Sequence, residues 1–411
     1  MDAADHKAAL RQYALITGNY WAFTLTDGAL RMLVVLHFHQ LGYGALQIAL
    51  LFLFYEVFGV VTNLVGGWLG ARIGLNRTMN IGLAMQVVAL SMLAIPTVWL
   101  SVPWVMAAQA LSGIAKDLNK MSAKSSIKLL VPDAGGALYR WVAALTGSKN
   151  ALKGVGFFLG GVLLAALGFR GAVLAMAAML ALVWLGSLVW LRRDLGKAKA
   201  RPKFSHLFSK SRPVNVLSAA RLFLFGARDV WFVVALPVFL VATLGWDDWQ
   251  AGAFLAAWII GYGIVQASAP RFVRGRDGHP PGRVAAFAWA AVLSLVPALM
   301  AWQLATGQPG DGVSAQTVLL AGLGMFGVLF AANSALHSYL IVSYAREDGV
   351  SLDVGFYYMA NAMGRLVGTV LSGWVYQASG LVACLWVSAA FVAVAAGVAL
   401  LLPAHEFKGE T

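Results

Sequence analysis

Residues 192–212, RRDLGKAKARPKFSHLFSKSR, divide the sequence near its middle, and eight of them are lysine or arginine. The sequence on both sides of this basic segment consists mainly of long apolar runs. A helix needs about 20 consecutive apolar residues to cross a bilayer. Six such runs precede the basic segment and six follow it. We therefore predict an all-α integral membrane protein with twelve transmembrane helices in two pseudo-symmetric six-helix halves, 1–191 and 214–411, joined by a basic cytoplasmic linker at 192–213.

The composition excludes a soluble protein. The chain has 411 residues, of which 60% are hydrophobic and 11% charged, whereas soluble domains are about 25% charged. The net charge of +13 would favour nucleic-acid binding in a soluble protein, but in a membrane protein much of it is expected in cytoplasmic loops. No nucleic-acid partner is therefore expected. The single cysteine, Cys384, rules out an intramolecular disulfide.

Charge-free stretches, with the prolines and glycines that interrupt them, locate the individual helices. The last stretch, 366–405, is long enough for two helices and is expected to break near Ser379 and Gly380. The expected spans are 13–36, 45–70, 78–97, 103–127, 140–166, 171–191, 214–241, 249–270, 284–304, 315–344, 353–377 and 381–402.

The lysines and arginines of the linkers predict the orientation. With the N-terminus inside, the six outward linkers contain one basic residue in total, Arg170. The inward segments carry the others, including the eight of residues 192–212. Because cytoplasmic loops are enriched in lysine and arginine, both termini are expected in the cytoplasm.

Two pairs of segments suggest that the halves are related by an internal repeat. Asp27 and Asp229 are each followed about fifteen residues later by Leu-Gly. The segments that begin at Asn150 and Asn361 read NALKG and NAMGR. Two six-helix halves with a basic cytoplasmic linker are typical of the major facilitator architecture.

The loop between spans two and three resembles the facilitator gating motif G-x-x-x-D-R-x-G-R/K-R/K. Residues 67–77 read GWLGARIGLNR, which supplies Gly67, Arg72, Gly74 and Arg77. Ala71 stands where the motif has its aspartate. The fold prediction is unaffected. Gly67, Arg72, Gly74 and Arg77 are expected to form a gating loop, but without the charge relay that the motif aspartate normally supplies.

Span four, PWVMAAQALSGIAKDLNKMSAKSSIKLL, places lysines every four residues on one helix face. A charge at the bilayer centre costs about 2.5–3.5 kcal/mol on insertion scales, so such groups face one another or a wet cavity. Lysines and arginines outnumber carboxylates within the spans. A transported anion is the simplest source of the missing negative charge. Arginine binds oxyanions through a planar fork, and lysine supplies a point charge.

The candidate site residues follow from these buried charges and their amide neighbours. The expected substrate-binding residues are Lys116, Lys120, Lys149, Asn150, Lys153, Arg228, Arg365, Asn19, Asn119 and Asn361. The expected coupling or charge-pair residues are Asp27, Arg31, Glu56, Asp117 and Asp229. Lys116, Lys149 and Lys153 would hold one oxyanion, and Arg228 and Arg365 the other.

Structural interpretations of the same residues stay open. Asp27 and Arg31 could form an i,i+4 latch, and Glu56 could be a paired carboxylate or a proton carrier. Lys124 is expected to extend its ammonium to the membrane surface. Arg228 and Asp229 are adjacent and point in different directions, so mutual pairing is not expected. The asparagines could bond helix to helix, and the glycines of spans five and eleven could serve packing or hinge motion.

Several segments with charges inside spans resemble the ArsJ family of organoarsenical efflux permeases. They include YALITGNYWAFTLTDGALRMLVVLHFHQLGY (13–43), QALSGIAKDLNKMSAKSSIKLLVPD (109–133), LTGSKNALKGVGFF (145–158), FGARDVWFVVALPVFL (225–240) and MANAMGRLVGTVLSGW (359–374). The resemblance implies export of 1-arseno-3-phosphoglycerate, a product of glyceraldehyde-3-phosphate dehydrogenase acting with arsenate. It also implies arsenate resistance, a functional partnership with that dehydrogenase, and a place in the bacterial inner membrane.

Three other functions are alternatives. A facilitator for another organic anion, such as a sugar phosphate or a drug, has the same charge requirements. A non-transporting membrane sensor would need a sizeable soluble domain, and the longest loop has about twenty residues. An enzyme would need a nucleophile motif or metal-ligand spacing, and none is evident. The chain is therefore expected to be a monomeric transporter without cofactor or metal, either coupled to protons or acting as a uniporter.

Overall fold

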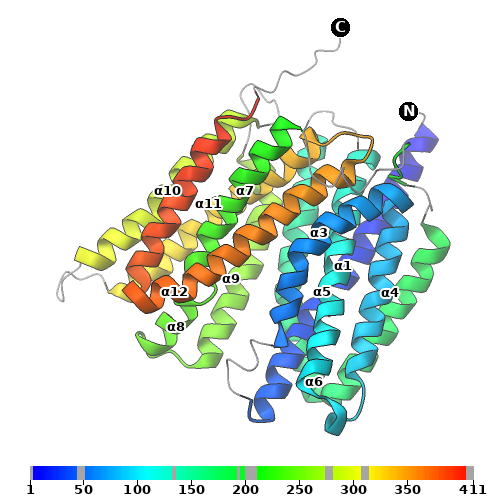
Figure 1. Cartoon of the computed structure of the whole chain (residues 1–411), viewed down its shortest axis with the longest axis horizontal. Coiled ribbons are helices and arrows are strands. Elements are labelled where there is room, and N and C mark those ends of the chain that lie inside the picture. Colours follow the sequence, from blue (N-terminus) through cyan, green and yellow to red (C-terminus); the bar gives the residue numbers. More distant parts are fainter. Residues whose placement is uncertain are drawn as a thin grey trace. The chain divides into compact units, whose positions relative to one another are not determined.

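The computed structural model describes residues 3–43, 51–131, 136–191, 195–199, 211–273, 281–306 and 314–403. These residues form helices and turns, without a strand (Figure 1). The helices are α1 (Ala3–Gln40), α3 (Leu53–Ile73), α4 (Leu75–Leu93), α5 (Val102–Leu130), α6 (Ala137–Trp190), α7 (Arg212–Phe232), α8 (Ala235–Ala242), α9 (Asp248–Ser268), α10 (Arg283–Thr306), α11 (Ala315–Tyr344) and α12 (Val350–Ala399), with 3-10 turns at Thr97–Trp99 and Ala269–Arg271. The predicted all-α class is confirmed.

Two long helices are each divided by a glycine. Gly168 in α6 has φ 66° and ψ 175°, and Gly380 in α12 has φ 74° and ψ −172°. Side chains with a Cβ rarely adopt such positive φ values, so glycine permits the sharp turn there. The kinks separate the predicted spans 140–166 and 171–191, and they separate 353–377 from 381–402. The break expected near Gly380 is thus confirmed.

The predicted span 214–241 is interrupted. α7 ends at Phe232, and the short helix α8 begins at Ala235. Ser372 Oγ accepts a hydrogen bond of 3.1 Å from the Ala235 amide that begins α8. The first part of the predicted span 45–70 lies outside the described residues, as do 192–194 and 200–210 of the predicted linker.

Six helical stretches are long and apolar enough to cross a membrane, judged by length and composition within the described ranges. They are Ala137–Trp190, Arg212–Ala242, Gln250–Arg271, Arg283–Thr306, Ala315–Tyr344 and Val350–Ala399. The charged and amide side chains of α5 lower its hydropathy. For α5, as for α1, α3 and α4, a transmembrane position stays a prediction from the sequence.

The chain forms two compact units. Unit 1 comprises Met1–Ser209 and Ala345–Met359, and unit 2 comprises Lys210–Tyr344 and Ala360–Thr411. The first ten residues of α12 thus belong to unit 1, which the sequence did not predict. The domain boundaries 1–191 and 214–411 stay a prediction.

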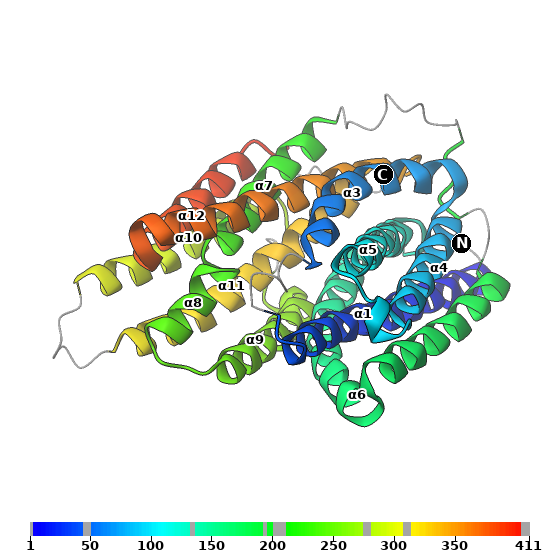
Figure 2. The same ribbon diagram turned by 60° about the horizontal axis from the view of Figure 1, so that its bottom comes forward.

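Glycines let the paired helices of each unit approach closely. In unit 1, α1 lies along α6 (Figures 1 and 2), and a Cβ placed on Gly156 would lie 3.1 Å from the Cα of Gly28. In unit 2, a Cβ on Gly368 would lie 2.6 Å from the carbonyl oxygen of Gly226. Small residues at helix contacts are a common packing device in membranes. These contacts favour the interpretation that the glycines of spans five and eleven serve helix packing.

Candidate substrate site

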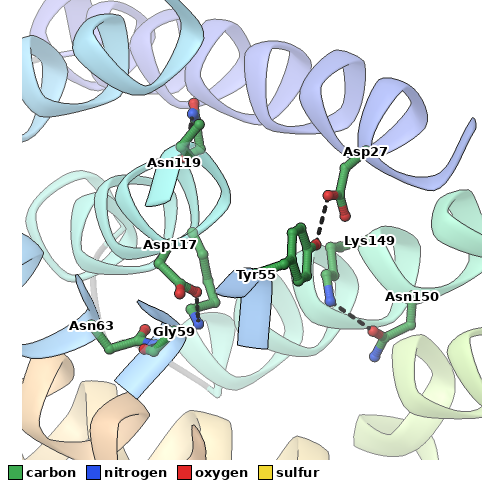
Figure 3. Close-up of polar contacts among 10 residues, drawn as sticks. Asp27, Tyr55, Gly59, Asn63, Asp117, Asn119, Lys149 and Asn150 are labelled. Carbon is green, nitrogen blue, oxygen red and sulfur yellow. Dashed lines mark hydrogen bonds and ion pairs between the residues drawn. The ribbon is translucent and has the colours of Figure 1, made fainter. Parts of the chain in front are cut away.

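Tyr55 on α3 is the centre of a charged cluster in unit 1. Its hydroxyl donates a hydrogen bond of 2.6 Å to Oδ1 of Asp27 on α1, as Figure 3 shows. The Lys116 ammonium on α5 lies 3.7 Å from the centre of the Tyr55 ring, and the Arg31 guanidinium lies 4.7 Å from it. Arg31 also lies 5.2 Å from the ring of Phe52. Three predicted residues from two helices thus meet at one tyrosine.

Tyr358, in the segment of α12 that belongs to unit 1, is the second such ring. The ammonium groups of Lys120 and Lys124 lie 4.9 Å and 5.2 Å from its centre. Lys120 also donates a hydrogen bond of 2.6 Å to Oδ1 of Asp117. The other oxygen of Asp117, Oδ2, is buried without a hydrogen-bond partner among the described residues. Two candidate residues of α5 therefore form an ion pair that is held against an aromatic ring.

Lys124 differs from the expectation that it would extend to the membrane surface. Its side chain is 4% exposed, and its ammonium donates a hydrogen bond of 2.6 Å to Thr146 Oγ1 on α6. This hydrogen bond replaces part of the hydration that the ammonium loses on burial. Lys124 is therefore an interior cation, although it was not among the candidate site residues predicted from the sequence.

The cationic residues of α6 lie beside the first tyrosine cluster. Lys149 donates a hydrogen bond of 3.2 Å to Oδ1 of its neighbour Asn150, as drawn in Figure 3. Lys153 interacts electrostatically with Arg31, Asp27, Lys149 and Lys116. The structure therefore brings Arg31 of α1, Lys116 of α5 and the two lysines of α6 into one electrostatic group. The side chain of Glu56, a further candidate, lies outside what the structure describes.

Two of the predicted asparagines serve contacts between or within helices. Asn19 donates a hydrogen bond of 3.0 Å to Ser187 Oγ on α6, and it also contacts the sulfur of Met79. Asn119 donates to the carbonyl of Ala115 on its own helix at 2.9 Å. Its amide packs against Gly82 of α4, where a Cβ would collide with it. These contacts favour the helix-packing interpretation, and a role in binding stays a prediction.

In unit 2, Asp229 is fully buried and joins two arginines. Its Oδ1 accepts from Arg228 at 2.5 Å, and its Oδ2 accepts from Arg365 on α12 at 3.1 Å. The side chains of Arg228 and Arg365 are 17% and 36% exposed. The expectation that Arg228 and Asp229 would not pair was wrong, because the long arginine side chain bends back to its neighbour. One carboxylate between two guanidinium groups leaves a net positive charge.

Arg221 on α7 is a buried cation that was not predicted from the sequence. Its side chain is 3% exposed, and its Nε donates a hydrogen bond of 2.9 Å to Oδ1 of Asn361. The guanidinium also lies 3.8 Å from the ring centre of Phe225. A usable signal existed, since Arg221 precedes Arg228 by two helical turns and therefore shares its face. Asn361, a predicted binding residue, is oriented by this arginine.

The loop predicted as a gate joins α3 to α4 in unit 1. Gly74 is the turn residue, with φ 101° and ψ 149°. The carbonyl of Gly67 accepts a hydrogen bond of 2.7 Å from Ser351 of α12. Arg72 and Arg77 are exposed, and Arg72 lies 4.9 Å from the ring centre of Trp68.

Ala71, which replaces the motif aspartate, is covered by part of the linker. The Ala71 carbonyl accepts a hydrogen bond of 2.8 Å from the amide of Ala198, and the Leu75 amide donates to the carbonyl of Leu195 at 2.7 Å. Backbone bonds from residues 195–199 therefore hold this turn in unit 1. A gating role for the loop stays a prediction.

Comparison with known proteins gives a family and a fold. A family model described as Major Facilitator Superfamily matches residues 16–307. No curated protein matches the chain.

Three solved structures share the fold at low sequence identity. The human organic anion transporter MFSD10 (TETRAN) is 18% identical with a TM-score of 0.71, over 97% of this chain and 100% of its own. The E. coli fucose:proton symporter FucP is 13% identical with a TM-score of 0.73, over 95% and 98%. A bacterial homologue of the iron transporter ferroportin, in an outward-facing state, is 14% identical with a TM-score of 0.72, over 94% and 98%. At identities this low, the similarity shows a shared fold alone.

Proposed function

Because the chain belongs to the major facilitator superfamily, we propose that it exports a small organic anion with an oxyanion at each end, 1-arseno-3-phosphoglycerate. The proposed setting is the bacterial inner membrane, with both termini in the cytoplasm, as the distribution of lysine and arginine favours. Export of this compound would confer resistance to arsenate.

The observation that carries the proposal is the excess of cations in the interior of unit 1. Arg31, Lys116, Lys120, Lys124, Lys149 and Lys153 outnumber the buried carboxylates with described side chains, Asp27, Asp117 and Asp353. Asp353 is itself paired with Arg346, whose side chain is 62% exposed. Charges of one sign repel each other strongly where the dielectric constant is low. A bound anion with several negative charges would relieve that repulsion. Neutral sugars would leave it unchanged, which favours an anionic substrate.

Transport would proceed by alternating access, in which the substrate site opens first to one face of the membrane and then to the other. An anion leaving a cell that is negative inside gains about 2.3 kcal/mol per charge per 100 mV. Export is therefore favourable without a coupled proton. Asp27, Asp117 and Asp229 would hold cations in place, and they stay candidates for coupling.

A growth experiment tests the proposed function. Arsenate-sensitive bacteria that lack their own glyceraldehyde-3-phosphate dehydrogenase would carry this chain with or without a co-expressed copy of that enzyme. We expect arsenate resistance with both proteins and none with either alone, because the dehydrogenase would form the exported compound. Lys149→Ala and Arg365→Ala should reduce resistance at equal expression, whereas Arg140→Ala, at an exposed position, should not. Resistance that is independent of the dehydrogenase would contradict the proposed substrate.

A second candidate is a transporter for another organic anion, such as a sugar phosphate. The similarity to a human organic anion transporter, at 18% identity, favours keeping this alternative. The same cluster of cations would serve either substrate. Uptake of a labelled sugar phosphate into everted vesicles, undiminished by the arseno-compound, would support this candidate over the first.

A further inference from the structure

Four cations of unit 1 are arranged in pairs on two tyrosine rings. Arg31 and Lys116 share the ring of Tyr55, at 4.7 Å and 3.7 Å from its centre. Lys120 and Lys124 share the ring of Tyr358, at 4.9 Å and 5.2 Å. Neither tyrosine belongs to the residues that the sequence singled out. Each of the two rings is thus in contact with two cations.

A ring and a carboxylate hold a cation with different consequences. The face of an aromatic ring attracts a cation through its quadrupole, but it carries no net charge. A carboxylate would attract more strongly and would also cancel the charge. A ring therefore keeps two mutually repelling cations in position and leaves their positive potential available to a ligand.

The two pairs differ in their nearest carboxylates. At Tyr358, Lys120 is also bound to Asp117 at 2.6 Å, so that pair is partly neutralised. At Tyr55, the carboxylate of Asp27 is bound by the tyrosine hydroxyl, while Lys153 adds a further cation to this electrostatic group. Counting only the side chains that the structure describes, the Tyr55 pair thus lies in the more positive surroundings of the two.

We propose that Tyr55 and Tyr358 position two oxyanion subsites of one ligand in unit 1. This proposal rests on the proposed function and refines its site. The Tyr55 subsite, Arg31 and Lys116, takes the more highly charged group, and the guanidinium offers it a bidentate fork. The Tyr358 subsite, Lys120 and Lys124, takes the less charged group.

The spacing of the subsites limits the length of the ligand. Lys116 and Lys120 are one turn apart on α5, about 6 Å along the helix axis. A chain of about three carbons with an oxyanion at each end spans a distance of this order. The buried hydroxyl of Tyr20 makes no hydrogen bond within the described part of the chain, and it interacts electrostatically with Asp27, Asp117 and Tyr358. It would supply a neutral donor to the ligand.

Two stable probes separate the subsites. 3-Phosphoglycerate carries a phosphate and a carboxylate on three carbons, whereas glycerol 3-phosphate carries the phosphate alone. Binding of each to the purified full-length protein would be measured by titration calorimetry. We expect 3-phosphoglycerate to bind the wild-type protein more tightly, because it occupies both subsites.

Leucine and phenylalanine variants test the role of each ring. Loss of a cation–π contact corresponds to about a three- to thirty-fold loss of affinity. We expect Tyr358→Leu to weaken the binding of 3-phosphoglycerate by this factor and to leave the binding of glycerol 3-phosphate unchanged. Tyr55→Leu should weaken the binding of both probes. Tyr358→Phe retains its ring and should bind both probes as the wild type does. The affinity of Tyr55→Phe for both probes should lie between that of the wild type and that of Tyr55→Leu, since the variant keeps the ring but loses the hydrogen bond to Asp27.

Three results would overturn the proposal. They are equal affinity of the wild type for the two probes, equal weakening of both probes by Tyr358→Leu, and a Tyr358→Phe protein as weak as Tyr358→Leu. Thermal unfolding of each variant shows whether it is folded. If a leucine variant is unfolded, the phenylalanine variant at the same position is used instead. Absence of probe binding would also overturn the subsites, while arsenate resistance in the growth experiment would still support the proposed function.

Discussion

Asp229→Asn removes one negative charge from between Arg228 and Arg365 and leaves the shape of the side chain nearly unchanged. The carboxylate is fully buried and accepts from both arginines, at 2.5 Å and 3.1 Å. In the variant, an amide oxygen can accept from one arginine. The other guanidinium then faces an amide group in the interior of unit 2.

The expected loss of stability follows from the exposure of each partner. Removing one member of a buried ion pair costs about 3–5 kcal/mol, because the remaining charge is buried without compensation. Arg365 is 36% exposed, so water screens its contact with Asp229, and Arg365→Gln should cost about 1 kcal/mol or less. Asp229→Asn should therefore be several-fold more destabilising than Arg365→Gln. The double variant should be more stable than Asp229→Asn alone, because one of the two uncompensated guanidinium groups is gone.

Thermal unfolding of the purified proteins in one detergent, followed by tryptophan fluorescence, gives the order of stability. Expression and monodispersity before heating are the controls for folding. If Asp229→Asn and Arg365→Gln unfold at the same temperature, the carboxylate does not hold both arginines. A double variant that is less stable than Asp229→Asn would equally refute the charge argument.

Three further predictions concern packing and polar contacts of unit 1, each measured by thermal unfolding. Gly67→Ala places a Cβ against the backbone of Ser351 and should cost about 1–3 kcal/mol, whereas Gly18→Ala, with open space around it, should have little effect. Ser351→Ala removes only the 2.7 Å hydrogen bond to Gly67 and should cost about 1 kcal/mol. Thr146→Val removes the acceptor of the buried Lys124 ammonium and should cost about 1–3 kcal/mol, while Thr146→Ser should retain most of the stability.

The helices and their principal kinks could be predicted from the sequence. Apolar runs of membrane length and the positions of Gly168 and Gly380 are local features, so they need no knowledge of tertiary contacts. The division of α12 between the two units could not be predicted in this way. It depends on contacts between Ser351 and Gly67, which lie 284 positions apart in the sequence.

The cations of the site could be found because a charge inside a span is unusual. Their partners could not, because partners are set by tertiary packing. Tyr55 and Tyr358 carry no distinguishing signal in a chain that is 12% aromatic. Lys124 was misjudged because depth along a helix does not reveal that Thr146 of another helix reaches it. The pairing of Arg228 with Asp229 likewise depends on a rotamer, which sequence spacing does not specify.

Uptake of arsenic into everted membrane vesicles would show whether the interior cations serve the export of a two-ended oxyanion. Vesicles with and without this chain would receive arsenate, glyceraldehyde 3-phosphate, NAD and purified glyceraldehyde-3-phosphate dehydrogenase. We expect arsenic accumulation that requires both the chain and the dehydrogenase, and that falls strongly in Lys116→Gln vesicles at equal protein level. Accumulation without the dehydrogenase, or undiminished accumulation in Lys116→Gln vesicles, would contradict it.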